Sequence, residues 1–220
     1  TIDVTNEIKS NQVNHLAVRA DHPAYIKDLP WVCGGCSDER GFSEGSQPMG
    51  IFRPVHLIVT NDVRIEPFGV HVWNDEKVNE QAATVNVDVQ FYNYSSLNRT
   101  IAVIHELKNN QGLLVARDVK IYPISKRSSN QSSTVFSLKK DVHLWSLNDP
   151  HLYSVETSIM DKGKIIDKVI TPYGIRSIKW DRGNSNRFFL NGKPVFINGI
   201  AEYEHMLGNS HAFSPEQIKA

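Results

Sequence analysis

Seven runs of alternating or β-branched residues, all within positions 63–170, constrain the fold more than any other feature of this sequence. Successive side chains on a strand point to opposite faces, so a period of two indicates a half-buried strand. About seven short strands over about 100 residues, separated by turn signals, are typical of an antiparallel β-sandwich. The predicted strands are 63–73, 83–92, 100–108, 113–122, 132–138, 152–160 and 164–170.

Turn-forming residues separate these runs at 109–112, 128–130 and 161–163. Asn, Asp, Ser and Gly favour turns because they tolerate positive φ or hydrogen-bond the local backbone. The serine-rich stretch 125–133 is predicted to be an exposed loop. The Cys…Trp…Cys signature of antibody domains is missing, so we expect an immunoglobulin-like sandwich without its disulfide.

The first 60 residues carry weaker signals. Residues 14–20 alternate around apolar Leu16 and Val18 and predict a short half-buried strand, and 51–60 predict another. Between them, 21–50 contain prolines and glycines with no sustained period, which is typical of either a functional loop or a disordered one.

The C-terminal part begins with a predicted β-hairpin. Asn191 and Gly192 supply the two positive-φ residues of a tight turn between the apolar runs 188–190 and 195–197. Further on, Ser214-Pro215-Glu216-Gln217 predicts a helix start, with serine as N-cap and glutamine closing a capping box.

Charge and composition exclude some classes of protein. Lys+Arg and Asp+Glu are equal at 24 each, and no basic stripe stands out, so nucleic acid is not an expected partner. No run of about 18 apolar residues occurs, so no membrane span is expected. The sequence starts at Thr1 rather than Met, so secretion cannot be read from this end.

Cysteine use is limited to Cys33 and Cys36 in the run CGGC. Such a pair can form half of a zinc site or a redox couple, but zinc needs two further ligands and the redox motif needs a βαβ context. Neither is visible, so we expect ordinary loop thiols or a local disulfide, with no metal and no cofactor.

Four ordered segments carry a family resemblance: MGIFRPVHL (49–57), LWSLNDPHLY (144–153), YGIRSIKW (173–180) and FFLNGKPVFINGI (188–200). Together they resemble glycoside hydrolase family 2, the β-galactosidase and β-glucuronidase family. The first resembles the strand that closes the family's jelly-roll domain. The other three resemble the junction where an immunoglobulin-like sandwich meets a (β/α)₈ catalytic barrel.

The resemblance implies an all-β chain with three parts. Residues 1–60 would be the end of a jelly-roll sugar-binding domain, 61–180 the sandwich, and 181–220 the truncated start of the barrel. The chain would then be a non-catalytic central fragment of a bacterial retaining enzyme that hydrolyses terminal β-linked sugars. A β-glycoside would be the substrate, a homo-oligomer is an open alternative, and a periplasmic or extracellular location is favoured over the cytoplasm.

Glycoside hydrolysis needs two carboxyl groups on opposite sides of the anomeric carbon. In the family, both are glutamates on later barrel strands that this sequence does not contain. Glu202 and Glu204 lie too close together in an extended segment to flank a sugar ring. We therefore expect no catalytic residue in this chain and no turnover by the chain alone.

Five residues are candidates for touching substrate in an intact enzyme. Asp21 follows the strand HLAVRA, much as an Asp of the family's jelly-roll loop does, and Trp31 could be a sugar platform. Glu204 and His205 match the end of the family's first barrel strand, where active sites form, and Tyr203 could stack on a pyranose. The family's Asn-Arg-His triplet is replaced here by Ala-Glu-Tyr, which puts the usual galactoside contacts in doubt.

The remaining tryptophans and two arginines have structural interpretations. Trp73, Trp145 and Trp180 sit at apolar strand positions and are predicted to lie in the core. Arg53 and Arg176 match recurrent family arginines and are predicted to anchor a domain interface through a carboxylate or carbonyl.

Two rival hypotheses remain open. The sandwich could be a stand-alone carbohydrate-binding or adhesion module, which predicts a row of exposed aromatic side chains on one sheet face. A cell-surface interaction domain would instead predict a tight protein partner, and it gains no support from the barrel-like C-terminal segment.

Overall fold

The computed structural model describes residues 2–19, 51, 53–183, 185–200 and 214–219. The chain divides into two compact units. The terminal unit comprises Thr1–Leu57 and Ile200–Ala220, and the sandwich unit comprises Ile58–Gly199. None of the described helices has the length and apolar character that a membrane span requires.

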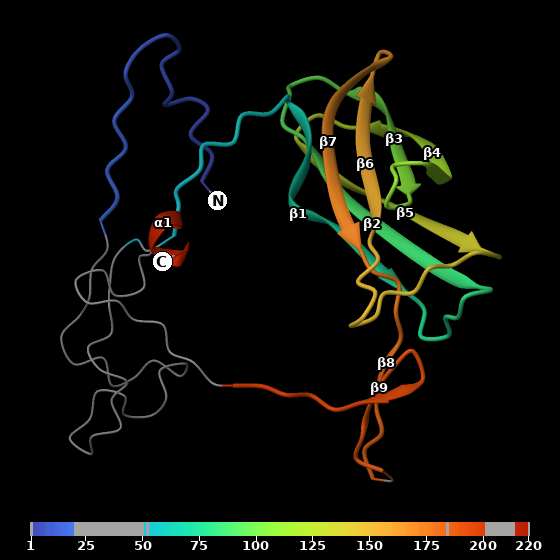
Figure 1. The fold of residues 1–220 in the computed structure, drawn as a ribbon. Coiled ribbons are helices and arrows are strands. Elements are labelled where there is room, and N and C mark those ends of the chain that lie inside the picture. The colour runs from blue at the N-terminus through green and yellow to red at the C-terminus, as the bar shows by residue number, and fades with distance from the viewer. Residues whose placement is uncertain (1, 20–50, 52, 184, 201–213, 220) are drawn as a thin grey trace. The chain divides into compact units, whose positions relative to one another are not determined.

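The sandwich unit contains a three-stranded and a four-stranded antiparallel sheet that face one another (Figure 1). The first has the order β1-β2-β5, with β1 at Val63–Asn74, β2 at Ala83–Asn93 and β5 at Ser128–Leu138. The second has the order β4-β3-β6-β7, with β3 at Arg99–Lys108, β4 at Leu114–Ile124, β6 at Tyr153–Asp161 and β7 at Lys164–Tyr173. All seven predicted strands are confirmed.

The topology differs from that of antibody constant domains in one strand. There the fourth strand pairs with the fifth, in an ABED sheet. Here β4 pairs with β3 along its length, which leaves three strands in one sheet and four in the other. The unit is thus an immunoglobulin-like sandwich whose fourth strand has changed sheets.

Two of the predicted turns are confirmed and one is wrong. Lys162 and Gly163 have positive φ between β6 and β7, and Gly112 has positive φ before β4. Ser128–Asn130, in contrast, are the first residues of β5 and pair with the end of β2. Cross-strand pairing therefore overrides the turn preference of serine and asparagine, and the turn itself contains Arg127 at φ 53°.

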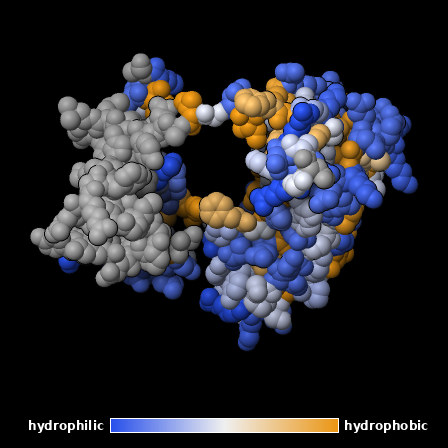
Figure 2. All heavy atoms as spheres, turned by 90° about the horizontal axis from the view of Figure 1, so that it is seen from below, coloured by the Kyte–Doolittle hydropathy of each residue, from blue (hydrophilic) through white to orange (hydrophobic). Residues whose placement is uncertain are grey.

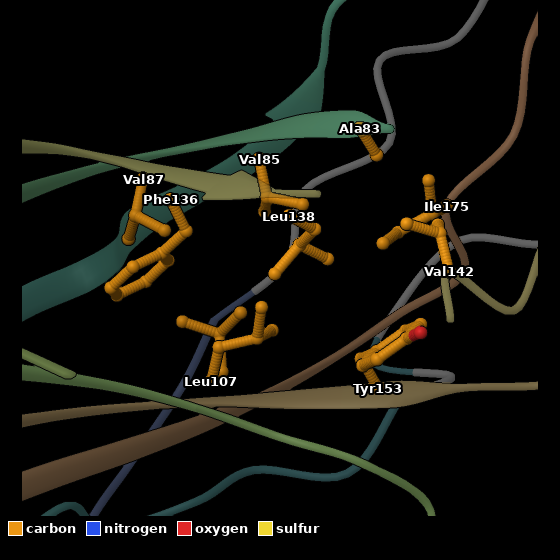
Figure 3. Close-up of a cluster of buried hydrophobic side chains, with 10 residues drawn as sticks. Ala83, Val85, Val87, Leu107, Phe136, Leu138, Val142, Tyr153 and Ile175 are labelled. Carbon is orange, nitrogen blue, oxygen red and sulfur yellow. The ribbon is translucent and has the colours of Figure 1, made fainter. Parts of the chain in front are cut away.

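Apolar residues from both sheets meet in two buried clusters, while hydrophilic and hydrophobic side chains are mixed on the surface that Figure 2 shows. Alternation explains the pattern, since Val85, Val87, Val89 and Phe91 of β2 are all 0% exposed while the residues between them are less buried. Figure 3 shows side chains of the first cluster pointing toward one another from the two sheets. The first cluster is Ala83, Val85, Val87, Leu107, Phe136, Leu138, Val142, Tyr153, Val155 and Ile175, and the second is Val63, Ile65, Val89, Phe91, Ile101, Val103, Ile124 and Ile159.

A third, small sheet follows the sandwich in the order β10-β9-β8. It consists of β8 at Ile178–Trp180, β9 at Phe188–Leu190 and β10 at Lys193–Val195. The predicted hairpin turn is confirmed, because Asn191 and Gly192 have φ of 50° and 74° between β9 and β10. The return strand was predicted two residues too late, since pairing begins directly after the turn.

Outside the three sheets, the described residues confirm one prediction and contradict two. Helix α1 at Pro215–Lys219 starts with the predicted capping box: the Gln217 amide donates to Ser214 Oγ (3.3 Å), and the Ser214 amide donates to Gln217 Oε1 (2.8 Å). The strands predicted at 14–20 and 51–60 are wrong, because the described residues of both ranges pair with no strand. Alternation alone does not make a strand without a hydrogen-bonded neighbour.

Candidate functional site

All five predicted substrate-binding residues lie outside the described residues: Asp21, Trp31, Tyr203, Glu204 and His205. The same holds for Cys33, Cys36 and Glu202. These predictions therefore stay predictions. The described residues of three of the four family-like segments, in contrast, can be followed, and they meet at one end of the sandwich.

The junction between the sandwich and the third sheet is held by a ladder of hydrogen bonds. The link between β7 and β8, residues 174–177, runs beside Trp145, whose amide donates to the Ile175 carbonyl (2.8 Å). Ile175 is fully buried in the first core cluster. Figure 1 shows β7 leading directly through this link to β8. We call residues 174–177 the junction link.

Asn74, the last residue of β1, binds the junction link from the sandwich side. Its Oδ1 accepts hydrogen bonds from the Tyr173 hydroxyl (2.5 Å) and the Arg176 amide (3.2 Å). Its Nδ2 donates to the Arg176 carbonyl (2.9 Å) and to the Asp75 carbonyl (2.7 Å). One side chain thus satisfies both backbone groups of Arg176, about 100 residues away in the sequence.

Asn191, in the turn of the β9–β10 hairpin, binds the link from the other side. Its Oδ1 accepts a hydrogen bond from the Ser177 backbone amide (2.9 Å). The backbone amide of Asn191 donates to the Ser177 carbonyl (2.9 Å). Its Nδ2 donates to the Trp145 carbonyl (2.9 Å). The hairpin, the link and the segment around Trp145 are therefore joined through one asparagine.

Trp145 fixes the link sterically. A Cβ added to Gly174 would lie 2.8 Å from three atoms of the Trp145 side chain, so only glycine fits there without a shift. The Arg176 guanidinium lies 5.5 Å from the centre of the Trp145 ring and donates to the Gly174 carbonyl (2.8 Å). Arg176 thus contacts a carbonyl, as predicted, and its role at a domain interface stays a prediction.

A hollow of about 230 Å³ opens beside the junction link. Trp73 and Glu76 line it from the end of β1 and the loop that follows. Arg176 and Ser177 line it from the link, and Asn74, Tyr173 and Ile178 complete the lining. Burial raises the pKa of the Tyr173 hydroxyl, which keeps that group a neutral hydrogen-bond donor to Asn74.

The core prediction for the tryptophans fails in part. Trp180 on β8 is 55% exposed and touches Phe188 edge-to-face. Trp73 and Trp145 are half-buried, and Trp73 stacks on the imidazole of His71 at 4.6 Å. An apolar strand position at a sheet end does not ensure burial, because the sandwich core stops short of the strand ends.

A histidine pair lies in the turn that enters β6. The rings of His143 and His151 stack at 3.9 Å, His143 Nε2 lies 2.5 Å from an Asp149 carboxylate oxygen, and His151 packs edge-on against Tyr153. Burial, followed by the nearby His143, lowers the pKa of His151. The chain bends at 147–148, where the Ser146 amide donates to the Asp149 carbonyl (2.9 Å) and the Asp149 amide donates to Ser146 Oγ (3.2 Å).

A buried histidine lies on β3 between Val103 of the second core cluster and Leu107 of the first. His105 on β3 is fully buried, and its Nδ1 lies 3.0 Å from Thr157 Oγ1 on the paired strand β6. Burial lowers the pKa of His105 to about 4, against the opposing field of Asp118. Within the part of the chain that the structure describes, no group of three His, Cys, Asp or Glu residues could hold a metal ion.

Comparison with known proteins decides the family. Residues 63–176, more than half of the chain, match the sequence model of Glycosyl hydrolases family 2. The chain belongs to this family. The match spans β1 to the junction link and so includes both Asn74 and Trp145.

Relatives of this family 2 chain include a β-galactosidase of Bacteroides ovatus, which is 29% identical over 94% of the chain and 22% of the relative. A β-glucuronidase of Formosa agariphila is 24% identical over 90% of the chain and 20% of the relative. The chain therefore spans about a fifth of the length of these relatives.

Solved structures agree on the fold. A β-glycosidase from Bacteroides vulgatus is 26% identical with a TM-score of 0.52, covering 66% of this chain and 17% of the other. A β-glucuronidase from Bacteroides uniformis, 20% identical, shares the fold with a TM-score of 0.66, covering 73% of this chain and 20% of that one.

Sequence reasoning missed Asn74 and Trp73. An asparagine at the end of a strand has no local signal that marks it as a long-range anchor. Trp73 was placed in the core by alternation, and only the fold shows that it lies at the open end of the sandwich and lines the hollow.

Proposed function

We propose that the chain is a non-catalytic part of a longer, retaining family 2 glycoside hydrolase that removes terminal β-linked sugars. The family match over 63–176, together with the small share of each relative that the chain covers, carries this proposal. The named relatives include both β-galactosidases and β-glucuronidases, and we propose a β-galactoside as the first substrate to test.

In this proposal the sandwich unit is a spacer, and the junction link that follows β7 is held in one conformation. Residues 1–60 would belong to a jelly roll, 61–180 to the sandwich, and 181–220 to the start of the barrel. The junction link would fix the direction in which the chain leaves β7, because asparagine side chains bind it on both sides. Asp21, Trp31, Tyr203, Glu204 and His205 would then line the substrate pocket.

The stereochemistry of hydrolysis tests the reaction. The longer polypeptide should release a sugar whose β-configuration is kept, as followed by NMR of the anomeric proton during the first minutes. Release of the α-anomer first, or no hydrolysis of a β-galactoside or a β-glucuronide, would contradict the proposal. The homo-oligomer stays a prediction, which light scattering on the same polypeptide tests.

A matched pair of glycine variants tests the role of the junction. Asn191→Gly keeps the positive φ of the hairpin turn and removes the side-chain bonds to Ser177 and Trp145. Lys162→Gly makes the same change in the β6–β7 turn, where the lysine side chain binds no described residue. We expect kcat/KM of the longer polypeptide to fall several-fold for Asn191→Gly alone. Equal activity of the two variants would contradict a positioning role.

A further inference from the structure

The hollow beside the junction link presents an aromatic ring that the core does not cover. Trp73 is half-buried, and one neighbour of its ring is the stacked imidazole of His71. Ile178, 55% exposed, adds a second apolar surface to the lining. A part-exposed indole at the rim of a concave surface offers apolar contact together with an N–H donor.

Two polar side chains that line the same hollow have no partner among the described residues. Glu76 is exposed, and its carboxylate makes no hydrogen bond or ion pair with any described residue. Ser177 uses its backbone to bind Asn191, while its hydroxyl has no partner among the described residues. The side chain of Asn74 lines the hollow but already makes four hydrogen bonds, so it is not counted among the groups that bind a ligand. Among the described residues, the hollow thus combines an unpaired carboxylate with an unpaired hydroxyl.

We propose that this hollow is a binding subsite for one ring of a neutral saccharide. A pyranose has apolar C–H faces and a rim of hydroxyls, so it matches a hollow lined by an indole, a carboxylate and a hydroxyl. The volume of about 230 Å³ is smaller than the pockets that hold drug-sized ligands and limits the occupant to a single ring.

A neutral sugar avoids placing a second carboxylate beside Glu76, which repels it. The Arg176 guanidinium also lines the hollow, and it is held by the Gly174 carbonyl and the Trp145 ring. This subsite requires no hydrolysis, so it stands apart from the proposed function.

The four tryptophans of the chain provide a direct assay. Each indole N–H gives one cross-peak in a ¹H–¹⁵N NMR spectrum, and Trp73→Phe identifies the peak of Trp73. Titration of the 220-residue chain with methyl β-galactoside should shift that peak with a dissociation constant in the millimolar range, on the order of 1–10 mM for a contact this small. Methyl β-glucuronide should bind more weakly. Tighter binding of the glucuronide would overturn the assignment of a neutral ligand.

Matched variants separate binding from folding. Glu76→Gln should weaken binding roughly tenfold, since it removes a charge-assisted acceptor. Glu80→Gln changes another exposed glutamate of the same loop, one that does not line the hollow, and should leave binding unchanged. Trp73→Ala should abolish the saturable shifts, which are then followed on neighbouring amide peaks, whereas Trp180→Ala should keep them.

Two further results would overturn the proposal. One is a titration in which no peak shifts saturably with the galactoside. The other is an equal loss of binding in the two members of a matched pair, either Glu76→Gln with Glu80→Gln or Trp73→Ala with Trp180→Ala. This comparison counts when both variants of the pair melt within a degree or so of the parent chain. Because these measurements need no turnover, their failure leaves the hydrolysis tests of the longer polypeptide unaffected.

Discussion

Replacing Asn74 by alanine removes three hydrogen bonds between the sandwich and residues near the junction link. The partners are the Tyr173 hydroxyl and both backbone groups of Arg176, at 2.5–3.2 Å. A typical intramolecular hydrogen bond contributes about 1 kcal/mol net, so the free energy of unfolding should fall by about 3 kcal/mol. The fourth bond, to the neighbouring Asp75 carbonyl, is local and exposed and adds little.

Urea denaturation of the 220-residue chain, followed by far-UV circular dichroism, measures this change from the midpoint and the slope. Asn86→Ala is the matched control, because its Nδ2 makes one exposed bond to the Asp75 carboxylate (3.0 Å), and it should cost about 0.5 kcal/mol or less. A loss for Asn74→Ala below about 1 kcal/mol, or one equal to that of Asn86→Ala, would refute the view that Asn74 anchors the link.

Two further predictions concern packing and pH. Gly174→Ala should destabilise the sandwich by about 1–3 kcal/mol, since the added Cβ would lie 2.8 Å from atoms of Trp145. In the control Gly199→Ala the added Cβ meets no atom within 4 Å, so stability should not change. Equal melting temperatures of the two variants would contradict this prediction. His105 has a pKa of about 4 in the folded state against 6.5 for the free side chain, so the unfolded state binds more protons between these values. Stability should therefore fall by about 3 kcal/mol as the pH drops from 6.5 to 4, because one pKa unit corresponds to about 1.4 kcal/mol. The lowered pKa of His151 acts in the same direction, and His105→Gln should remove most of the slope; an unchanged slope would contradict the assignment.

The strands and tight turns could be predicted from the sequence because their causes are local. Alternation along β2 reports directly which side chains face the core, and Asn191-Gly192 has the φ values that its turn needs. The capping box of α1 likewise involves only four consecutive residues. In each case the deciding interaction lies within a few positions of the residues that signal it.

The failed predictions have causes far apart in the sequence. Ser128 begins a strand because it pairs with Asn93, and nothing in the serine-rich run indicates that partner. The role of Asn74 depends on Arg176, which becomes its neighbour only when β1 and β7 lie in facing sheets. The strand predicted around Leu16 fails for the same reason, since periodicity cannot supply a pairing partner.

The most direct test of the central claim is a hydrolysis assay on the 220-residue chain itself. The chain belongs to family 2, and we propose that it lacks the opposed carboxyl pair that the reaction needs. With 4-nitrophenyl β-galactoside and β-glucuronide, the purified chain should release no 4-nitrophenol above the buffer rate, while the longer polypeptide hydrolyses at least one of them. Turnover by the 220-residue chain at an enzymatic rate, on the order of 1 s⁻¹ or faster, would contradict the account.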